Sequence, residues 1–373
     1  MGFLTVDEVY FALALLHSPG VGHANAKFAL SHFPDLSKLF QSNKSKLLKI
    51  PGIGEKAAAG IQSGIGKFKA EEIIKNAQKE QISIIPFFDE EYPKKLRQII
   101  DAPFVLYLKG AIDLNFNKTI GIVGTRDATT YGIEVTGKII NENAIYNPCI
   151  ISGLAYGIDI ASHRKAIECK LPTVAILAGG LDRVYPSIHQ KTVDRMLING
   201  GILSEQPPGT KPDAHLFPAR NRIIAGLSDT VIVVEAKAKG GALITAELAD
   251  SYNKPVFAVP GNLNQVTSEG CNLLIRNQKA LIYTGVKDLQ YHLNWTSEIN
   301  HEKTSHQLKP LPELNDNEKT LYQLLVDHPA GIHIDELSWK SEIQINLLSS
   351  ILLSLEFKGL LKPLPGKKYK AIK

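Results

Sequence analysis

The feature that most constrains this fold is a series of short apolar runs that alternates with amphipathic helical segments between residues 104 and 285. The runs read FVLYLKG, TIGIVGT, CIISG, TVAILAG, GILSEQ, TVIVVEA, PVFAVPG and ALIYT. Apolar runs separated by helical segments are typical of parallel strands that are buried on both faces. We therefore predict an α/β fold with an extended Rossmann-like, doubly wound, mostly parallel sheet that contains at least six of these strands.

The regions on either side of this sheet have different patterns. Residues 1–80 read as short helices separated by glycine turns, and the turns at residues 18–23 and 50–57 both have the form of a helix-hairpin-helix unit. Residues 316–373 show three helical runs and then a pair of strands, an order typical of a winged helix. For both regions, contact with DNA and a purely structural or protein-contact role remain alternatives.

These patterns predict four segments along the chain. A small helical domain of the helix-hairpin-helix or SAM-like type covers residues 1–80, and the Rossmann-like domain covers residues 81–295. The segment 296–315 is polar, contains two prolines and lacks periodicity, so we predict a linker there. A winged-helix domain covers residues 316–373.

Composition limits the class of protein. No apolar run approaches the roughly 18 residues that a transmembrane helix needs, and acidic residues stand near the start where a signal peptide carries basic ones. We therefore expect a soluble, cytoplasmic protein with no membrane partner. The three cysteines lie far apart without a CxxC pair, so neither a disulfide framework nor a metal site is predicted.

The arginines are concentrated in the predicted sheet domain. The net charge of +5 is mild, but all of the arginines fall between residues 97 and 276, while both ends of the chain use only lysine. Arginine has a planar guanidinium that can bind phosphate through two parallel hydrogen bonds. The distribution therefore suggests an anionic partner for the central domain.

The loops after the strands do not match the common nucleotide-binding motifs. The first loop reads Gly121-Ile122-Val123-Gly124-Thr125-Arg126 instead of GxGxxG, and no GxxxxGK[ST] sequence is present. We predict no cofactor. His163 lies four residues after Asp159 on one helix face, but a structural role is preferred, and Glu205 and Glu247 have no accompanying nucleophile or metal cluster. We therefore predict no catalytic residues and no enzymatic activity.

These loops instead have the features of anion sites. Small residues stand where strands end before helices, at the edge of the sheet where ligands bind. The stretch 211–222 adds cations and an aromatic ring, the combination that single-stranded nucleic acid requires. The candidate contact residues are Gly124, Thr125, Arg126, Ser152, Gly153, Lys211, Phe217, Arg220, Asn221, Arg222, Gly240 and Gly241. A core position for Phe217 and an ion pair for Arg220 remain the alternative.

Six long runs resemble one family, the DNA-processing protein A family (DprA, also called Smf). They are GIVGTRDATTYG, SGLAYGIDIASHRKA, AILAGGLDRVYP, SEQPPGTKPDAHLFPARNRIIAGLSDTVIVVEA, GGALITAELA and VPGNLNQVTSEGCNLLI, and the resemblance spans residues 85–285. It implies cooperative binding of single-stranded DNA, a homodimer through the Rossmann-like domain, and help in loading a RecA-type recombinase during natural transformation, with protection of the incoming DNA.

The resemblance also implies which side chains contact DNA. They are Arg126, Phe217, Arg220 to Arg222 and Lys239, with Lys211 a less secure transfer. One position departs from the family pattern, because Gly240 stands where a small polar residue is usual. A hydroxyl contact to phosphate is therefore in doubt, whereas donation by backbone N–H groups is not affected.

Two other classes of function remain as alternatives. The sheet type and the order Gly-Gly-x-x-x-Thr-x-Glu resemble phosphoribohydrolases that cleave nucleoside monophosphates. Those enzymes carry a tighter PGGxGTxxE loop, and the different spacing here places Glu247 elsewhere. A protein-bridging scaffold with no affinity for DNA is the third possibility.

Overall fold

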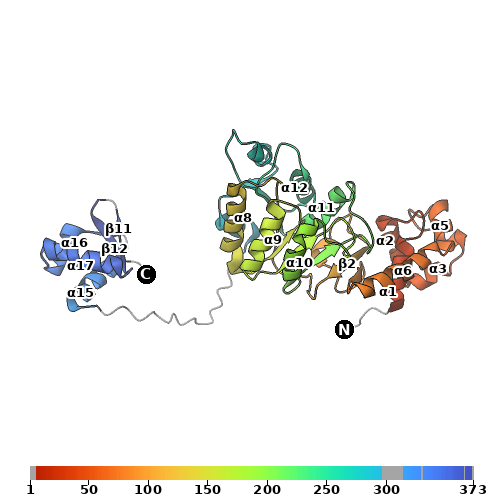
Figure 1. The fold of residues 1–373 in the computed structure, drawn as a ribbon, viewed down its shortest axis with the longest axis horizontal. Coiled ribbons are helices and arrows are strands. Elements are labelled where there is room, and N and C mark those ends of the chain that lie inside the picture. Colours follow the sequence, from red (N-terminus) through yellow and green to blue (C-terminus); the bar gives the residue numbers. More distant parts are fainter. Residues whose placement is uncertain (1–5, 296–313, 329–330, 365, 372–373) are drawn as a thin grey trace. The chain divides into compact units, whose positions relative to one another are not determined.

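The computed structural model describes residues 6–295, 314–328, 331–364 and 366–371 (Figure 1). The chain forms two compact units, residues 1–297 and 298–373, and each is described by itself. Nearly all of the linker predicted at residues 296–315 lies outside the described residues. Among the described helices, none is long and apolar enough to cross a membrane.

A nine-stranded sheet forms the centre of the first unit. Its strands are β1 (Ser83–Pro86), β2 (Val105–Lys109), β3 (Thr119–Val123), β4 (Cys149–Ser152), β5 (Thr173–Ile176), β6 (Gly200–Ser204), β7 (Thr230–Val233), β8 (Val256–Ala258) and β9 (Leu281–Ile282). They lie in the order β1-β2-β6-β5-β4-β3-β7-β8-β9. The pairs β1–β2 and β2–β6 are antiparallel, and all other neighbouring strands are parallel. The prediction of a doubly wound, mostly parallel sheet is confirmed.

Helices cover both faces of this sheet. One face carries α8 (Thr130–Asn143), α9 (Ile158–Glu168) and α14 (Val286–Leu293), and the other carries α7 (Lys94–Arg97), α11 (Leu216–Leu227), α12 (Gly241–Ser251) and α13 (Glu269–Arg276). Strand β3 shows why both faces are apolar: Ile120 and Ile122 pack on the first side and Val123 packs on the second. The short helix α10 (Gln190–Met196) packs beside α9 and β6.

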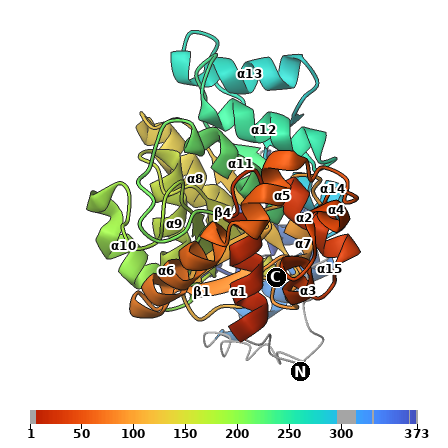
Figure 2. The ribbon, with the colours of Figure 1, turned by 90° about the vertical axis from the view of Figure 1, so that its right-hand side faces the viewer.

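In the described residues, six short helices precede the sheet, and the first and the last of them, Val6–Leu16 and Ile65–Lys79, pack next to β1 (Figure 2). They are α1 (Val6–Leu16), α2 (His23–His32), α3 (Leu36–Phe40), α4 (Lys44–Leu47), α5 (Glu55–Gln62) and α6 (Ile65–Lys79). The two glycine turns pack against each other. A Cβ at Gly20 would lie 3.0 Å from the nitrogen of Ala57, and one at Gly52 would lie 2.6 Å from Asn25 Oδ1. Both glycines have positive φ, so the turns need glycine for conformation and for close packing.

The first of these turns holds the helical region against the sheet. His23, the first residue of α2, accepts a hydrogen bond from the backbone N–H of Phe104 at 2.9 Å, and its Nε2 lies 3.4 Å from Glu205. Burial lowers the pKa of His23, so the ring is neutral at physiological pH. The helical region and the sheet are therefore joined by specific buried contacts within one compact unit.

The second unit is a winged helix. It contains α15 (Asp316–Asp327), α16 (Ile334–Ser341) and α17 (Ile345–Phe357), and its sheet has the order β10-β12-β11, formed by Ile332–His333, Lys368–Ala371 and Leu361–Leu364. The three helices and the terminal strand pair are as predicted, and the two-residue β10 was not foreseen. Hydrogen bonding by Lys358 lowers the pKa of Glu318 to about 2. This carboxylate caps α15 and ties it to α17 through Ser354.

Candidate nucleic-acid interface

A pocket of about 310 Å³ opens where the order of the parallel strands reverses, at the carboxyl ends of β3 and β7. In doubly wound sheets this crevice is the usual ligand site, because neighbouring loops diverge there. The residues that line the pocket come from the loop after β3, the start of α9, the start of α11, and the segment between β7 and α12. Four loops that are far apart in the sequence therefore meet at one site.

Hydrogen bonds to Glu235 hold the loop after β3 in place. The backbone N–H of Thr125 donates to the carbonyl of Glu235 at 2.7 Å. The carboxylate of Glu235, which is only 2% exposed, accepts hydrogen bonds from the N–H and the hydroxyl of Thr129 at 2.9 and 2.6 Å. This anchoring fixes the backbone on both sides of Arg126, whose side chain is exposed at the rim of the pocket. The loop therefore presents a guanidinium to solvent from a rigid base.

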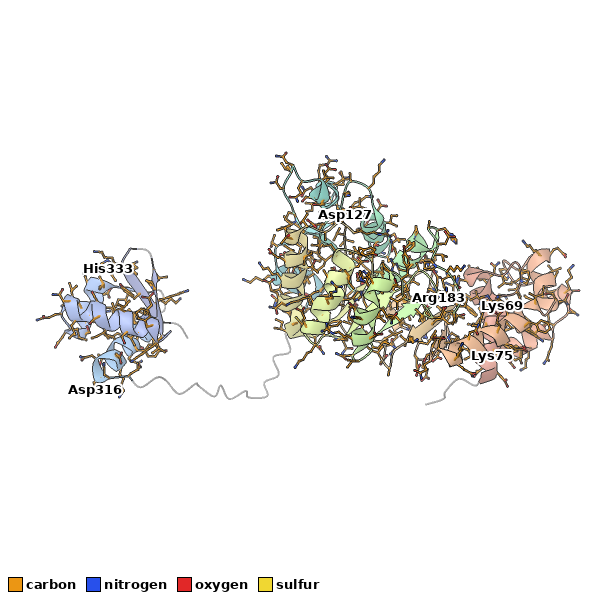
Figure 3. The ribbon with its side chains drawn as sticks, viewed as in Figure 1. Lys69, Lys75, Asp127, Arg183, Asp316 and His333 are labelled. Atoms are coloured by element: carbon orange, nitrogen blue, oxygen red, sulfur yellow. The ribbon has the colours of Figure 1, made fainter. Side chains whose placement is uncertain are left out.

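An ion pair between two side chains lies at the same rim of the pocket. Lys237 Nζ lies 2.8 Å from a carboxylate oxygen of Asp127, and both side chains are largely exposed. Hydrogen bonding by Lys237 lowers the pKa of Asp127, so the carboxylate stays ionised at neutral pH. Asp127 is labelled in Figure 3 and marks this loop. The pair links the loops after β3 and β7 across the mouth of the pocket.

Phe217 forms the aromatic wall of the pocket and is contacted by two arginines. The Cζ atom of Arg126 lies 5.5 Å from the ring centroid, and that of Arg220 lies 5.9 Å from it. Tyr185 packs edge-on, with 6.2 Å between the ring centroids. Phe217 is half-buried, so part of its ring is available to a ligand. Cation–π contacts of this kind are worth about 0.5–2 kcal/mol and hold the aromatic and the cation side by side.

Arg220 has a different environment from Arg126. Its side chain is buried and donates to the carbonyl of Gly153 at 2.6 Å and to the carbonyl of Ile176. Burial lowers the pKa of Arg220 to about 10 and raises the pKa of the nearby Asp159. Neither change removes the charge of the guanidinium at neutral pH. Arg220 is therefore a buried cation beneath the pocket that joins β4, β5 and α11.

The start of α12 forms the remaining wall. Lys239 is exposed, and Gly240 is the N-cap of the helix, so the first N–H groups of α12 lie at the pocket. N–H groups at a helix start have no partner within the helix and favour an anion. A Cβ placed at Gly240 would meet no atom within 4 Å. The backbone here is therefore open to a ligand.

The structure brings most of the predicted contact residues together. Gly124, Thr125, Arg126, Phe217, Arg220, Asn221, Lys239, Gly240 and Gly241 all line the pocket. Gly153 lines a smaller neighbouring cavity that shares Phe217 and Arg220. Ser152, Lys211 and Arg222 line neither cavity.

Two of these three side chains have internal partners. The hydroxyl of Ser152 is fully buried and donates to the carbonyl of Ile122 at 2.6 Å. Arg222 forms a paired hydrogen bond with Glu205, at 2.9 and 2.6 Å, and only 12% of its side chain is exposed. Lys211 is exposed in the loop before α11. The pocket itself is therefore built from a smaller set of side chains than the sequence motifs contain.

The structure adds residues that the motifs did not single out. Asp127, Asp159, Lys237 and Thr245 line the main pocket, and Arg183 and Tyr185 line the smaller cavity. Lys237 had a usable signal, since it stands two residues before Lys239 in the same loop. Tyr185 lies in the run AILAGGLDRVYP, but only the three-dimensional structure shows that its ring meets Phe217.

Of the groups weighed as acid–base candidates, Asp159 lines the pocket, whereas His163, Glu205 and Glu247 do not. His163 is fully buried, and its Nδ1 lies 2.7 Å from Thr173 Oγ1. Glu247 is exposed on α12 and pairs with Lys279 at 3.3 Å. In the part of the chain that the structure describes, no group of three or more His, Cys, Asp or Glu side chains is arranged to hold a metal ion.

Comparison with known families matches all three regions of the chain. The family described as DNA recombination-mediator protein A matches residues 83–294, the DprA winged helix domain matches residues 306–367, and the SAM-like helix-hairpin-helix tandem matches residues 12–67. A protein named Smf from Synechocystis is 31% identical and covers 97% of this chain and 98% of its own length. The DNA processing protein DprA of Bacillus subtilis is 40% identical over 61% of this chain and 77% of its own length.

Solved structures agree with the sequence matches. DprA from Streptococcus pneumoniae superposes with a TM-score of 0.67 and 30% identity, covering 78% of this chain and 99% of that one. DprA from Helicobacter pylori, whose structure is described as showing a single-stranded DNA binding mode, superposes with a TM-score of 0.52 and 32% identity, covering 57% of this chain and 96% of that one. The chain belongs to the DNA recombination-mediator protein A family, the DprA/Smf family.

Proposed function

We propose that this protein binds single-stranded DNA in the pocket at the carboxyl ends of β3 and β7. The observation that carries the proposal is the position of two exposed cations, Arg126 and Lys239, beside the half-buried ring of Phe217 and the open start of α12. Cations suit phosphate, and an aromatic face suits an unpaired base, which a duplex does not offer. The single-strand binding described for the Helicobacter pylori relative supports the same assignment.

In this proposal, the exposed residues of the pocket contact DNA directly, and the buried ones act from beneath it. Arg126 and Lys239 contact phosphates through their side chains, and Gly124, Thr125, Gly240 and Gly241 contribute backbone groups. Phe217 stacks on a base. Arg220 and Asn221 act from the floor, where the buried guanidinium adds positive potential to the site. Ser152, Gly153 and Arg222 stabilise the fold around the pocket and do not contact DNA, and Lys211 acts outside the pocket.

Arg126 has to change partner when DNA binds. In the structure its guanidinium lies against the ring of Phe217. A base that stacks on that ring displaces Arg126, which then reaches a phosphate. The two contacts exchange, so the loss of one cation–π contact partly offsets the gain of one charge-assisted hydrogen bond.

We further propose that the protein acts in the cytoplasm during natural transformation, where it protects incoming single strands and helps load a RecA-type recombinase, and that it dimerises through the Rossmann-like domain. The family membership supports these roles. We propose no catalytic step. The phosphoribohydrolase alternative is disfavoured because Glu247, the glutamate that it would use, is on the surface in an ion pair with Lys279 and does not line the pocket.

Fluorescence anisotropy with a labelled oligothymidine and a duplex of equal length, each at two salt concentrations, tests the main proposal. We expect tighter binding of the single strand, with the logarithm of affinity falling by about 0.7 per neutralised phosphate for each tenfold rise in salt. Equal affinity for the two forms, or no dependence on salt, would refute it. Release of free base from a nucleoside monophosphate would favour the enzyme.

A further inference from the structure

A groove of about 710 Å³ lies beside β1, at the end of the sheet away from β9 and outside the DNA pocket. Apolar residues line it on both faces of β1: Ile84 packs with Val9 of α1 on one face, and Leu108 and Ile112 pack with the core on the other face. The volume is in the range of pockets that enclose a ligand. None of the residues that line it also lines the DNA pocket.

Strand β1 offers unpaired backbone groups to this groove. It is the last strand of the sheet, and it pairs with β2 alone. The backbone N–H of Phe87 donates to the carbonyl of Phe104. In an antiparallel pair, every second residue directs its N–H and C=O groups to the neighbouring strand, so the backbone groups of Ile85 and Ser83 also point to β2. The N–H and C=O groups of Ile84 therefore point away from β2. An edge of this kind can accept an additional strand.

The rim of the groove is acidic. Every charged residue that lines it is a carboxylate: Asp89, Glu90, Glu91 and Asp113. Within the described residues, no lysine, arginine or histidine side chain forms an ion pair with any of the four. Arg97 donates to the backbone carbonyl of Asp89, and the carboxylate of Asp89 accepts from the backbone N–H of Glu91 at 2.9 Å. The negative charge repels nucleic acid and attracts cationic groups.

We infer that this groove binds an extended, basic segment of a partner protein, which adds a strand to β1. Alternate side chains of an added strand point to opposite faces. One set, which is apolar, would therefore pack against apolar residues of the groove, and the other set, lysine or arginine, would meet the four carboxylates. The edge supplies affinity through the main chain, and the rim supplies the preference for positive charge. This inference does not depend on the proposed DNA binding.

A synthetic heptapeptide of alternating lysine and valine, labelled for anisotropy and added to the full chain, tests the inference. We expect it to bind more tightly than a glutamate–valine heptapeptide, and expect salt to weaken it. The double variant Glu90→Lys/Glu91→Lys should weaken binding about tenfold. Both glutamates are exposed, and neither side chain forms a hydrogen bond or an ion pair with another described residue, so the double variant should fold. Glu134→Lys/Glu356→Lys changes the net charge equally on exposed helix positions and should leave peptide affinity unchanged.

Two further measurements distinguish backbone pairing with β1 from attraction by charge, and peptide binding from DNA binding. A lysine–valine peptide with an N-methyl group on every residue has no backbone N–H on either edge to donate to β1, and it should bind at least tenfold more weakly. Single-strand affinity of the Glu90→Lys/Glu91→Lys protein should not fall, which keeps failure here distinct from failure of DNA binding. The inference is overturned if the acidic peptide binds as well as the basic one, if both double variants behave alike, or if N-methylation has no effect.

Discussion

Arginine has opposite environments in the pocket proposed to bind DNA and in the cluster around Glu205. At the pocket, Arg126 is exposed on a rigid loop and lies against the aromatic ring of Phe217. In the cluster, Arg222 is largely buried against Glu205, and His23 approaches the same carboxylate at 3.4 Å. Arg222 and Arg220 come from one run, FPARNR, which the family resemblance assigns to DNA as a whole. Burial and partners therefore decide what each arginine does.

The difference has an energetic basis. Taking an ion pair out of water costs several kcal/mol per ion, so removing one partner leaves an expensive uncompensated charge. An exposed arginine without a carboxylate partner keeps its hydration, and its removal costs the folded state little. Changes in the Glu205 cluster should thus affect stability, while changes at the pocket rim should affect binding.

The largest effect is expected from Arg222→Ala. The substitution leaves Glu205, which is 8% exposed, beside a neutral histidine and should lower the free energy of unfolding by about 3–5 kcal/mol. Urea denaturation followed by circular dichroism measures it. Arg183→Ala, whose side chain is 79% exposed, is the matched control and should change stability by less than about 0.5 kcal/mol. Single-strand affinity per folded molecule should be unaltered by Arg222→Ala. A stable variant that binds DNA poorly would reverse the assignment of Arg222.

The second largest effect is expected from Arg126→Ala, which should lower the affinity for single-stranded DNA. Loss of a charge-assisted contact worth about 1.5–3 kcal/mol should weaken single-strand affinity roughly ten- to a hundred-fold. Arg126→Lys should restore only part of it, because a point charge cannot replace the planar fork. Anisotropy titrations and melting temperatures should be measured together. If Arg126→Ala lowers the melting temperature sharply and leaves affinity unchanged, the exposed and buried arginines are not distinct in role.

A third prediction concerns the buried His163 and the dependence of the free energy of unfolding on pH. Burial lowers the pKa of His163 to about 3, and Thr173 Oγ1 donates to a carbonyl and so accepts from the ring N–H at Nδ1. The unfolded chain takes up a proton near pH 6.5 and the folded chain does not. Stability is therefore complete above pH 6.5 and falls as the pH decreases towards 3, by roughly 2 kcal/mol at pH 5 from this residue alone.

Urea denaturation at pH 7.5 and pH 5 measures this dependence. His163→Asn, which retains a side-chain donor, should reduce the difference between the two pH values even if it lowers stability at both. His215→Asn is the control, because His215 is exposed beside Asp213. An unchanged pH dependence in the His163 variant would assign the effect to other buried histidines such as His17, whose pKa burial lowers to about 4.

The sequence predicts the sheet well because buried parallel strands leave an unambiguous apolar signal. All eight predicted runs are strands of one sheet, and the turn glycines mark the loops that meet at the pocket. Burial of individual polar residues was harder to predict. Arg220 and Arg222 differ by two positions on α11, yet one lies beneath the pocket and the other faces Glu205, a partner from β6. Such pairings depend on tertiary contacts that no local pattern encodes.

The smallest effect is expected from Gly240→Ser, at the position where this chain departs from its family. Gly240 is the N-cap of α12 with an extended backbone, and a Cβ there meets no atom within 4 Å, so serine fits without strain. As an N-cap, serine should stabilise the helix over glycine by a few tenths of a kcal/mol. Its hydroxyl also adds a donor toward bound phosphate, and a net hydrogen bond of about 0.5–1 kcal/mol corresponds to a roughly two- to fivefold gain in single-strand affinity.

Gly240→Ala adds the Cβ alone and should leave affinity unchanged. If serine and alanine behave alike, the hydroxyl does not reach a phosphate. If alanine weakens binding tenfold, the bound strand approaches the backbone too closely for any side chain, and glycine at this position is itself part of the binding surface.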